Sequence, residues 1–89
     1  MSDNKNLRID GQRLWDSLME MAKIGATEKG GCKRLALTDL DRESRDLFVK
    51  WCKGAGCTIR VDKMGNIFAR RAGRNNDLPP VMTGSHLDT

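Results

Sequence analysis

The spacing of the apolar residues changes along this sequence from the period of a helix to the period of a β-strand. In the stretches 10–24 and 38–55 they recur every three or four positions, which is typical of a helix with one buried face. In 58–62 and 67–70 apolar and polar residues alternate, which is typical of half-buried strands. A last apolar stretch, 81–83, follows two prolines. We therefore predict an α/β fold in which helix, helix, β-hairpin and strand build a mixed sheet covered by helices.

The first helix has readable ends. Asp10 is placed to accept hydrogen bonds from the free amides of the first turn, and Ile9 can pack on Leu14 as a hydrophobic staple. Gly25 suits the left-handed conformation in which helices commonly end. We expect a buried apolar face made of Leu14, Trp15, Leu18, Met21 and Ala22.

The second helix is predicted to begin at Thr38, an N-cap residue with Asp41 at capping-box spacing. The acids Asp39, Asp41 and Glu43 are better explained as partners of the helix dipole than as a catalytic pair. Gly54 or Gly56 should end this helix. Its buried stripe is expected to contain Leu40, Leu47, Phe48, Trp51 and Ala55.

The segment 25–37 between the two helices contains Gly30-Gly31 and Arg34. A P-loop is rejected, because no strand precedes the glycines and no Gly-Lys-Ser/Thr follows them. A mobile surface loop is one interpretation. The other is a loop that faces a substrate, with Arg34 as a contact for an anion.

The charge of the chain suggests, but does not specify, a partner. The net charge of +4 and the pI of about 9.3 are compatible with a free-standing, non-catalytic basic α+β module that binds an acidic partner. Twelve acids are interleaved with the basic residues, and two Trp, two Phe and no Tyr offer little surface for stacking bases. We therefore expect no nucleic-acid partner.

Membrane insertion and secretion are not expected either. No apolar run is long enough to span a bilayer, and Met1–Asn6 lacks the apolar core of a signal peptide. The three cysteines are an odd number without a disulfide pattern, which fits a reducing cytoplasm. Cys52 and Cys57 are expected to behave as small buried apolar residues.

The candidate site is the pair His86 and Asp88. In an extended segment, side chains two positions apart point to the same side, roughly 6–7 Å apart along the chain, so Asp88 can orient the imidazole. A catalytic zinc needs about three protein ligands, and this sequence has one His and no Cys-x-x-Cys pair. Either His86 is an ordinary histidine, or these 89 residues are the front piece of a larger enzyme.

Five motifs together are more specific than the His-x-Asp pair alone. They are Ile-Gly-Ala-Thr at 24–27, Gly-Gly at 30–31, Arg-Leu-Ala-Leu-Thr at 34–38, Asp-Lys-Met-Gly-Asn-Ile-Phe-Ala-Arg-Arg at 62–71 and Thr-Gly-Ser-His-Leu-Asp-Thr at 83–89. From about residue 10 onward the chain resembles the start of a hydantoinase/carbamoylase-type amidohydrolase. That family includes N-carbamoyl-L-amino-acid hydrolases, β-ureidopropionases and allantoate amidohydrolases, within the broader group of dinuclear-zinc peptidases.

The resemblance implies a metal-dependent hydrolase acting on the carbamoyl C–N bond of N-carbamoyl or ureido acids. It implies that His86 is a ligand of one of two zinc or manganese ions, and that Asp88 is the carboxylate that orients it. It further implies that residues 1–89 are an incomplete N-terminal part of a catalytic domain. The other ligands, the general base and a lid domain that forms a homodimer would lie downstream, so this chain alone would be inactive.

Overall fold

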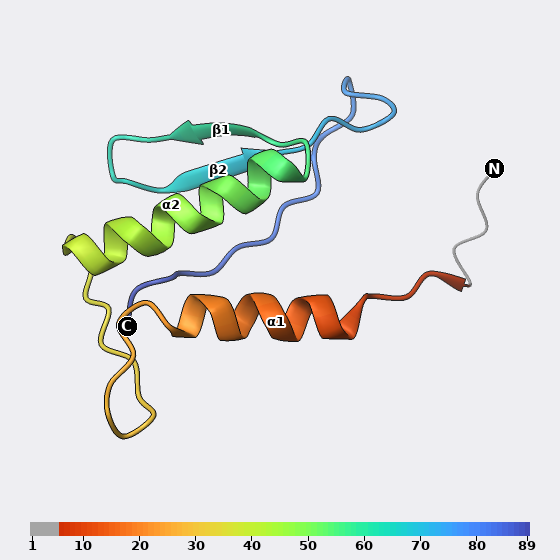
Figure 1. The fold of residues 1–89 in the computed structure, drawn as a ribbon. Helices are drawn as coiled ribbons and strands as arrows, with labels where there is room; N and C mark the ends of the chain where they lie inside the picture. The colour runs from red at the N-terminus through yellow and green to blue at the C-terminus, as the bar shows by residue number, and fades with distance from the viewer. Residues whose placement is uncertain (1–5) are drawn as a thin grey trace.

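The computed structural model describes residues 6–89 and shows two helices followed by a β-hairpin (Figure 1). Helix α1 spans Gly11–Ala22 and helix α2 spans Asp39–Gly54. Strands β1 (Thr58–Val61) and β2 (Ile67–Arg70) form an antiparallel sheet of two strands. The α/β class and the order helix, helix, hairpin are therefore confirmed.

Helix α1 begins as its sequence predicts. The side chain of Asp10 accepts a hydrogen bond from the backbone N–H of Arg13 at 3.0 Å and so serves as the N-cap. The helix ends at Ala22, two residues before the predicted end, with Lys23 as its C-cap. Gly25 follows with a φ of 87°, a left-handed conformation that only glycine adopts cheaply.

Thr38 is the N-cap of helix α2, and its hydroxyl accepts from the N–H of Asp41 at 3.3 Å. The carboxylate of Asp41 accepts from the N–H of Leu37 at 3.0 Å, one residue before the position that a standard capping box uses. Asp41 is buried beside the fully buried Ser44, so it is more than a solvent-exposed partner of the helix dipole. The helix ends at Gly54, as predicted.

The hairpin is held by its turn and lies along α2. Thr58 pairs with Arg70 and Val61 with Ile67. In the turn, the carboxylate of Asp62 accepts from the N–H groups of Met64 and Asn66, both at 2.9 Å. Helix α2 packs against β1, whereas α1 makes no contact of comparable extent with any element in residues 6–89.

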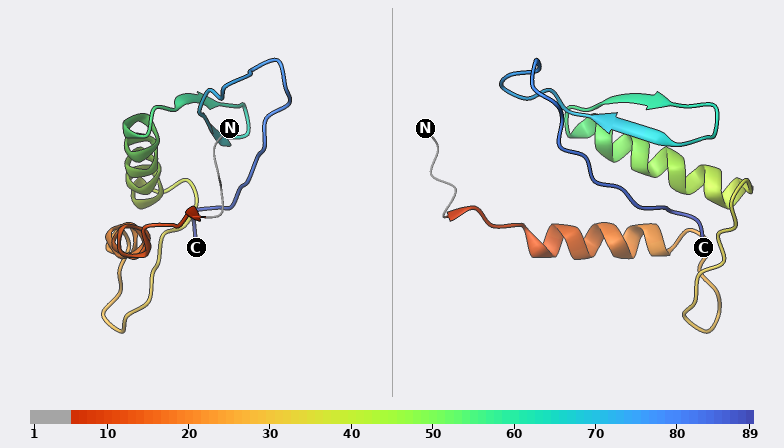
Figure 2. Two further views of the ribbon diagram at one scale, coloured as in Figure 1. Left: turned by 90° about the vertical axis from the view of Figure 1, so that its right-hand side faces the viewer. Right: turned by 180° about the vertical axis from the view of Figure 1, so that it is seen from behind.

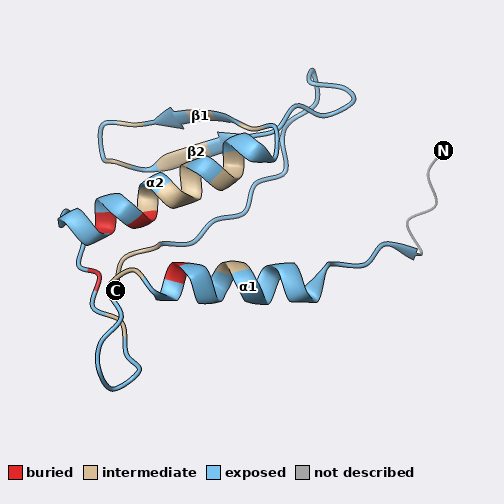
Figure 3. Ribbon diagram, viewed as in Figure 1, coloured by how far each residue is buried: buried red, intermediate tan, exposed pale blue. Residues whose placement is uncertain are grey.

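The apolar face of α1 is exposed, which corrects the expectation that it forms a core. Met21 is the buried residue of this helix, and Figure 3 shows most of the helix surface as exposed. Leu14, Trp15 and Leu18 expose between 51% and 57% of their surface. Ile9 is also exposed, so it buries no staple against Leu14. The stripe is amphipathic as predicted, but nothing within residues 6–89 covers it.

The strand expected at 81–83 is not formed. From residue 79 to residue 89 the chain has no regular secondary structure, and Val81 and Met82 are exposed. A strand needs a neighbour to complete its backbone hydrogen bonds, and β1 and β2 pair only with each other. The segment instead returns past the hairpin and α2 to the end of α1, as both views in Figure 2 show.

The predictions on secretion and membranes have separate outcomes. Met1–Lys5, the main part of the stretch considered as a leader, lies outside the described residues. Within residues 6–89, no helix has the length and apolar character needed to cross a bilayer.

Candidate functional site

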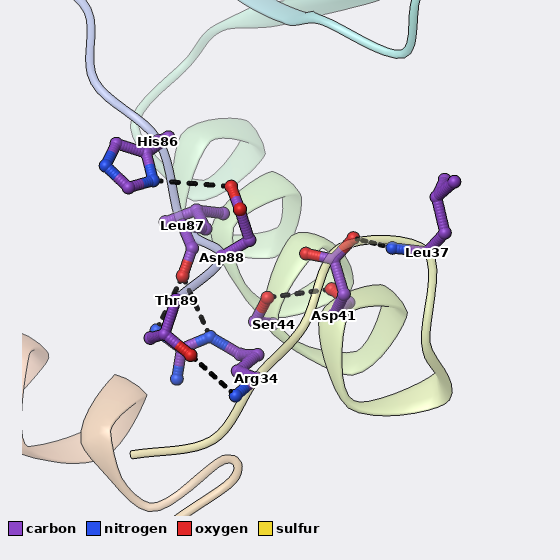
Figure 4. Close-up of polar contacts among 8 residues, drawn as sticks. All are labelled: Arg34, Leu37, Asp41, Ser44, His86, Leu87, Asp88 and Thr89. Atoms are coloured by element: carbon purple, nitrogen blue, oxygen red, sulfur yellow. Dashed lines mark hydrogen bonds and ion pairs between the residues drawn. The ribbon is translucent and has the colours of Figure 1, made fainter. Parts of the chain in front are cut away.

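His86 and Asp88 are in contact, as their spacing predicts. The imidazole Nδ1 lies 3.3 Å from the carboxylate Oδ1 of Asp88 (Figure 4). This distance is at the long end for a hydrogen bond to a charged group, which is usually about 2.7–2.9 Å. The contact comes from two side chains on the same side of a short segment, with Leu87 between them.

The geometry leaves one imidazole nitrogen available. With Nδ1–H donating to Asp88, the neutral ring presents the lone pair of Nε2 to its surroundings. The side chain of His86 is 77% exposed and that of Asp88 is 41% exposed. A carboxylate that fixes the tautomer of an imidazole, and raises its basicity, is the usual support of a metal-ligating histidine.

The described residues do not complete a metal site. No group of three or more His, Cys, Asp or Glu side chains in residues 6–89 is arranged to hold an ion. Zinc sites use about three or four protein ligands. Within residues 6–89 the arrangement offers one imidazole with a neighbouring carboxylate, which is fewer ligands than a zinc site uses.

Arg34 does not face a substrate as one interpretation of its loop predicted. It is 7% exposed, and its guanidinium donates to the carbonyl oxygens of Leu87, Met21 and Ile24. Its outer nitrogens are thus already bonded within the chain. The hypothesis that Arg34 binds an anion is wrong in this structure.

The Gly30-Gly31 loop is closed by its own backbone. Ala26 and Cys32 form an isolated β-bridge at its base. The N–H of Gly31 donates to the hydroxyl of Thr27 at 3.0 Å, and the N–H of Gly30 donates to the carbonyl of the same residue at 3.2 Å. These amides are therefore not free to cradle a phosphate, in agreement with the rejection of a P-loop.

The three cysteines are free thiols of intermediate burial. Cys52 and Cys57 are thus less buried than expected. Partial burial, followed by the proximity of Cys57, raises the pKa of the Cys52 thiol, which favours its neutral, unreactive form. Cys32 accepts a hydrogen bond from Arg34 at 3.2 Å.

The attachment of Arg34 to the segment 87–89, and the part that Thr89 plays in it, were missed from the sequence. Besides the guanidinium of Arg34, its backbone N–H donates to the hydroxyl of Thr89 at 2.8 Å, and the N–H of Thr89 donates back to the carbonyl of Arg34 at 2.8 Å. These contacts join positions 55 residues apart. The one available signal was the presence of both residues in the motifs at 34–38 and 83–89.

Comparison with known proteins shows that the chain is similar to amidohydrolases. No family model matches the chain. It is 55% identical over 85 residues to an N-carbamoyl-L-amino-acid amidohydrolase of Rhizobium meliloti, covering 96% of this chain and 20% of that protein. It is 40% identical over 81 residues to an N-carbamoyl-L-amino acid amidohydrolase of Geobacillus stearothermophilus, covering 91% of this chain and 20% of that protein.

A solved structure is similar in both fold and sequence. The amidase of the hydantoinase/carbamoylase family from Burkholderia vietnamiensis superposes with a TM-score of 0.92 at 65% identity. The match covers 99% of this chain and 21% of that one. The chain thus spans about a fifth of the length of the relatives that it matches.

Proposed function

The chain belongs to the hydantoinase/carbamoylase family of amidases, and we propose that it forms part of a metal-dependent amidohydrolase. The proposed reaction is hydrolysis of the carbamoyl C–N bond of an N-carbamoyl amino acid or a related ureido acid. The observation that supports it is the contact of His86 Nδ1 with Asp88, in a chain that is 55% identical over 85 residues to an N-carbamoyl-L-amino-acid amidohydrolase.

The proposed role of His86 is to bind one of two divalent ions, zinc or manganese, through Nε2. Asp88 holds the proton on Nδ1 and so keeps the ring in the tautomer that can bind. When bound, such ions polarise the scissile carbonyl and activate water near neutral pH. In this chain His86 would bind and Asp88 would orient; neither would transfer a proton to the substrate.

The remaining parts of the proposed enzyme lie outside this chain. We propose that residues 1–89 are the N-terminal part of its catalytic domain, and that the other ligands and the general base belong to the rest of that domain. A separate lid domain would form the homodimer. The exposed apolar face of α1 supports a larger domain, because Leu14, Trp15 and Leu18 have no cover within residues 6–89. The proposed compartment is the cytoplasm.

The test is a metal-activation curve for hydrolysis of an N-carbamoyl amino acid by the full-length protein. We expect His86→Ala to lose bound metal and nearly all activity. Asp88→Asn keeps the shape of the side chain but weakens the charged hydrogen bond, so we expect about 10–100-fold lower metal affinity or activity, with partial rescue by excess metal. Asp77→Asn, a change in an exposed loop, is the matched control and should behave as wild type.

The outcomes separate the ligand from its orienting group. Wild-type metal affinity and activity in Asp88→Asn would show that the orienting role is wrong. The same result in His86→Ala would overturn the metal-binding role altogether. A non-catalytic basic module that binds an acidic partner would then be the better account of the chain.

A further inference from the structure

We propose that Arg34 is a positioning residue for the pair His86 and Asp88. Its guanidinium holds the carbonyl of Leu87, which belongs to the peptide group leading into Asp88, and thereby fixes the backbone of the segment that carries both side chains. The inference rests on the proposed function, because it assigns Arg34 a role toward the metal ligand. It goes beyond that function by naming a residue that touches neither metal nor substrate.

The contact with Leu87 is a two-pronged one. Arg34 Nε donates to the Leu87 oxygen at 3.0 Å, and Nη2 donates to the same oxygen at 2.8 Å. Figure 4 shows both bonds converging on this carbonyl below the His86–Asp88 contact. Two donors from one rigid plane fix direction as well as distance, which a flexible ammonium group does not do.

The other side of the guanidinium is anchored at the end of α1. Nη1 donates to the carbonyl of Met21 at 3.1 Å and to that of Ile24 at 2.6 Å. The last carbonyls of a helix have no partner within the helix and carry partial negative charge, so a cation is favourable there. Arg34 therefore bridges a rigid element and the site segment.

The segment that carries the site has few other supports. Each hydrogen bond that links residues 86–89 to the rest of the described chain is made by Arg34, through either its side chain or its backbone. The backbone pair with Thr89 continues the attachment past Asp88. Without these bonds the His86–Asp88 segment would have no polar attachment to α1 or its loop.

A local anchor matters because a metal ligand must be held in place. The Leu87 carbonyl belongs to the peptide group between Leu87 and Asp88, so loss of its anchor would free the backbone of the segment that carries both side chains. His86 is exposed and Asp88 is half-buried, so packing alone cannot hold the pair. Groups that act through a ligand in this way typically alter metal affinity or activity 10–100-fold.

The decisive variant is Arg34→Lys in the full-length protein, because it keeps the charge and removes the two-pronged contact. Arg74→Lys, in an exposed loop, is the matched control. Hydrogen–deuterium exchange of the metal-free proteins measures the anchoring of residues 86–89, with β1 and β2 as internal references. Titration with zinc alone then measures binding at His86, and His86→Ala identifies the part of that binding which His86 supplies.

We expect Arg34→Lys to speed exchange at residues 86–89 about ten-fold, to leave β1 and β2 unchanged, and to weaken zinc binding about ten-fold. Unchanged exchange at 86–89 would overturn the anchor. Equal acceleration in β1 and β2 would assign Arg34 a general structural role and overturn positioning. Faster exchange with wild-type zinc affinity would also overturn positioning. If His86→Ala binds zinc like wild type, the proposed function is wrong, and so is the proposed effect of Arg34 on metal binding. The exchange experiment decides separately whether Arg34 anchors residues 86–89.

Arg34→Lys leaves a buried group with a poorer set of partners, so a second variant covers the case in which it does not fold. Arg34→Gln buries a neutral amide in place of the charge and cannot make the two-pronged contact to Leu87 together with the bonds to Met21 and Ile24. Faster exchange at 86–89 and weaker zinc binding in Arg34→Gln would support anchoring by the guanidinium. Wild-type values for both would overturn it.

Discussion

Residues 38–70 and the segment 79–89 are held in place by different means. In 38–70, residues close in sequence form the cap of α2 and the turn of the hairpin, and α2 packs against β1. In 79–89 no regular structure forms, and the end of the segment is attached by the hydrogen bonds of Arg34, more than fifty positions earlier. The comparison teaches that α2 and the hairpin are held by local contacts, whereas the segment that carries the proposed site is placed by a side chain distant in sequence.

The largest expected effect concerns the 89-residue chain in isolation. Because the apolar face of α1 is exposed, we expect the chain to self-associate or to unfold without a sharp transition. Sedimentation and thermal unfolding measure this. A monomer that unfolds cooperatively above about 60 °C would contradict this prediction, because the exposed apolar face of α1 would then need no partner surface.

A pair of variants ties that result to α1. Leu18→Gln removes apolar surface from the exposed face of the helix and should reduce self-association. Met64→Gln removes an even more exposed apolar side chain from the hairpin turn and should not reduce it. Equal effects of the two changes would mean that α1 is not the associating surface.

The sequence predicted the scaffold better than the site because the scaffold is specified locally. Asp10, Thr38 and the turn at 62–66 act on neighbours within four residues, so their effects can be derived from spacing alone. The pairing of His86 with Asp88 is local in the same way. The burial of Arg34 depends on carbonyls brought together by the fold, which spacing does not reveal.

The errors have the same origin. A strand at 81–83 was expected from its apolar residues, yet a strand exists only with a neighbour, and within residues 6–89 it has none. The stripe on α1 was expected to be buried because of its periodicity. Periodicity predicts which face of a helix is apolar, but it does not supply the surface that covers it.

A smaller effect is expected from Gly25→Ala, at the start of the segment 25–37 that carries Arg34. This change tests whether the segment that anchors residues 86–89 depends on its own backbone geometry. A Cβ at Gly25 would lie 2.6 Å from the carbonyl oxygen of Lys33, and the φ of 87° is unfavourable for alanine. We expect about 2 kcal/mol less stability against local opening of this loop. Amide exchange of residues 26–34 in the full-length protein measures it.

Gly54→Ala is the matched control within the scaffold. A Cβ at Gly54 meets nothing within 4 Å, and the residue is the last of helix α2. Alanine should therefore be neutral or should stabilise α2 by up to about 1 kcal/mol. If Gly25→Ala were equally harmless, the close approach of Gly25 to Lys33 would have no part in holding Arg34.

The smallest expected effect is the acid response of the hairpin turn. The side-chain amide of Asn66, followed by the backbone N–H groups of Asn66 and Met64, lowers the pKa of Asp62 below its ordinary value of 3.8. Because the pKa is lowered in the folded state, the charged carboxylate stabilises the turn at pH values above the ordinary pKa of 3.8. This contribution is lost as the pH falls from about 3.8 through the lowered pKa.

An NMR titration of the Asp62 carboxyl should give a midpoint below 3.8. Asn66→Ala removes the largest cause and should move the midpoint upward, whereas Asn75→Ala, in the loop after β2, should not. A midpoint unaffected by Asn66→Ala would mean that the backbone N–H groups of residue 66 and Met64, and not the Asn66 side chain, lower the pKa of Asp62.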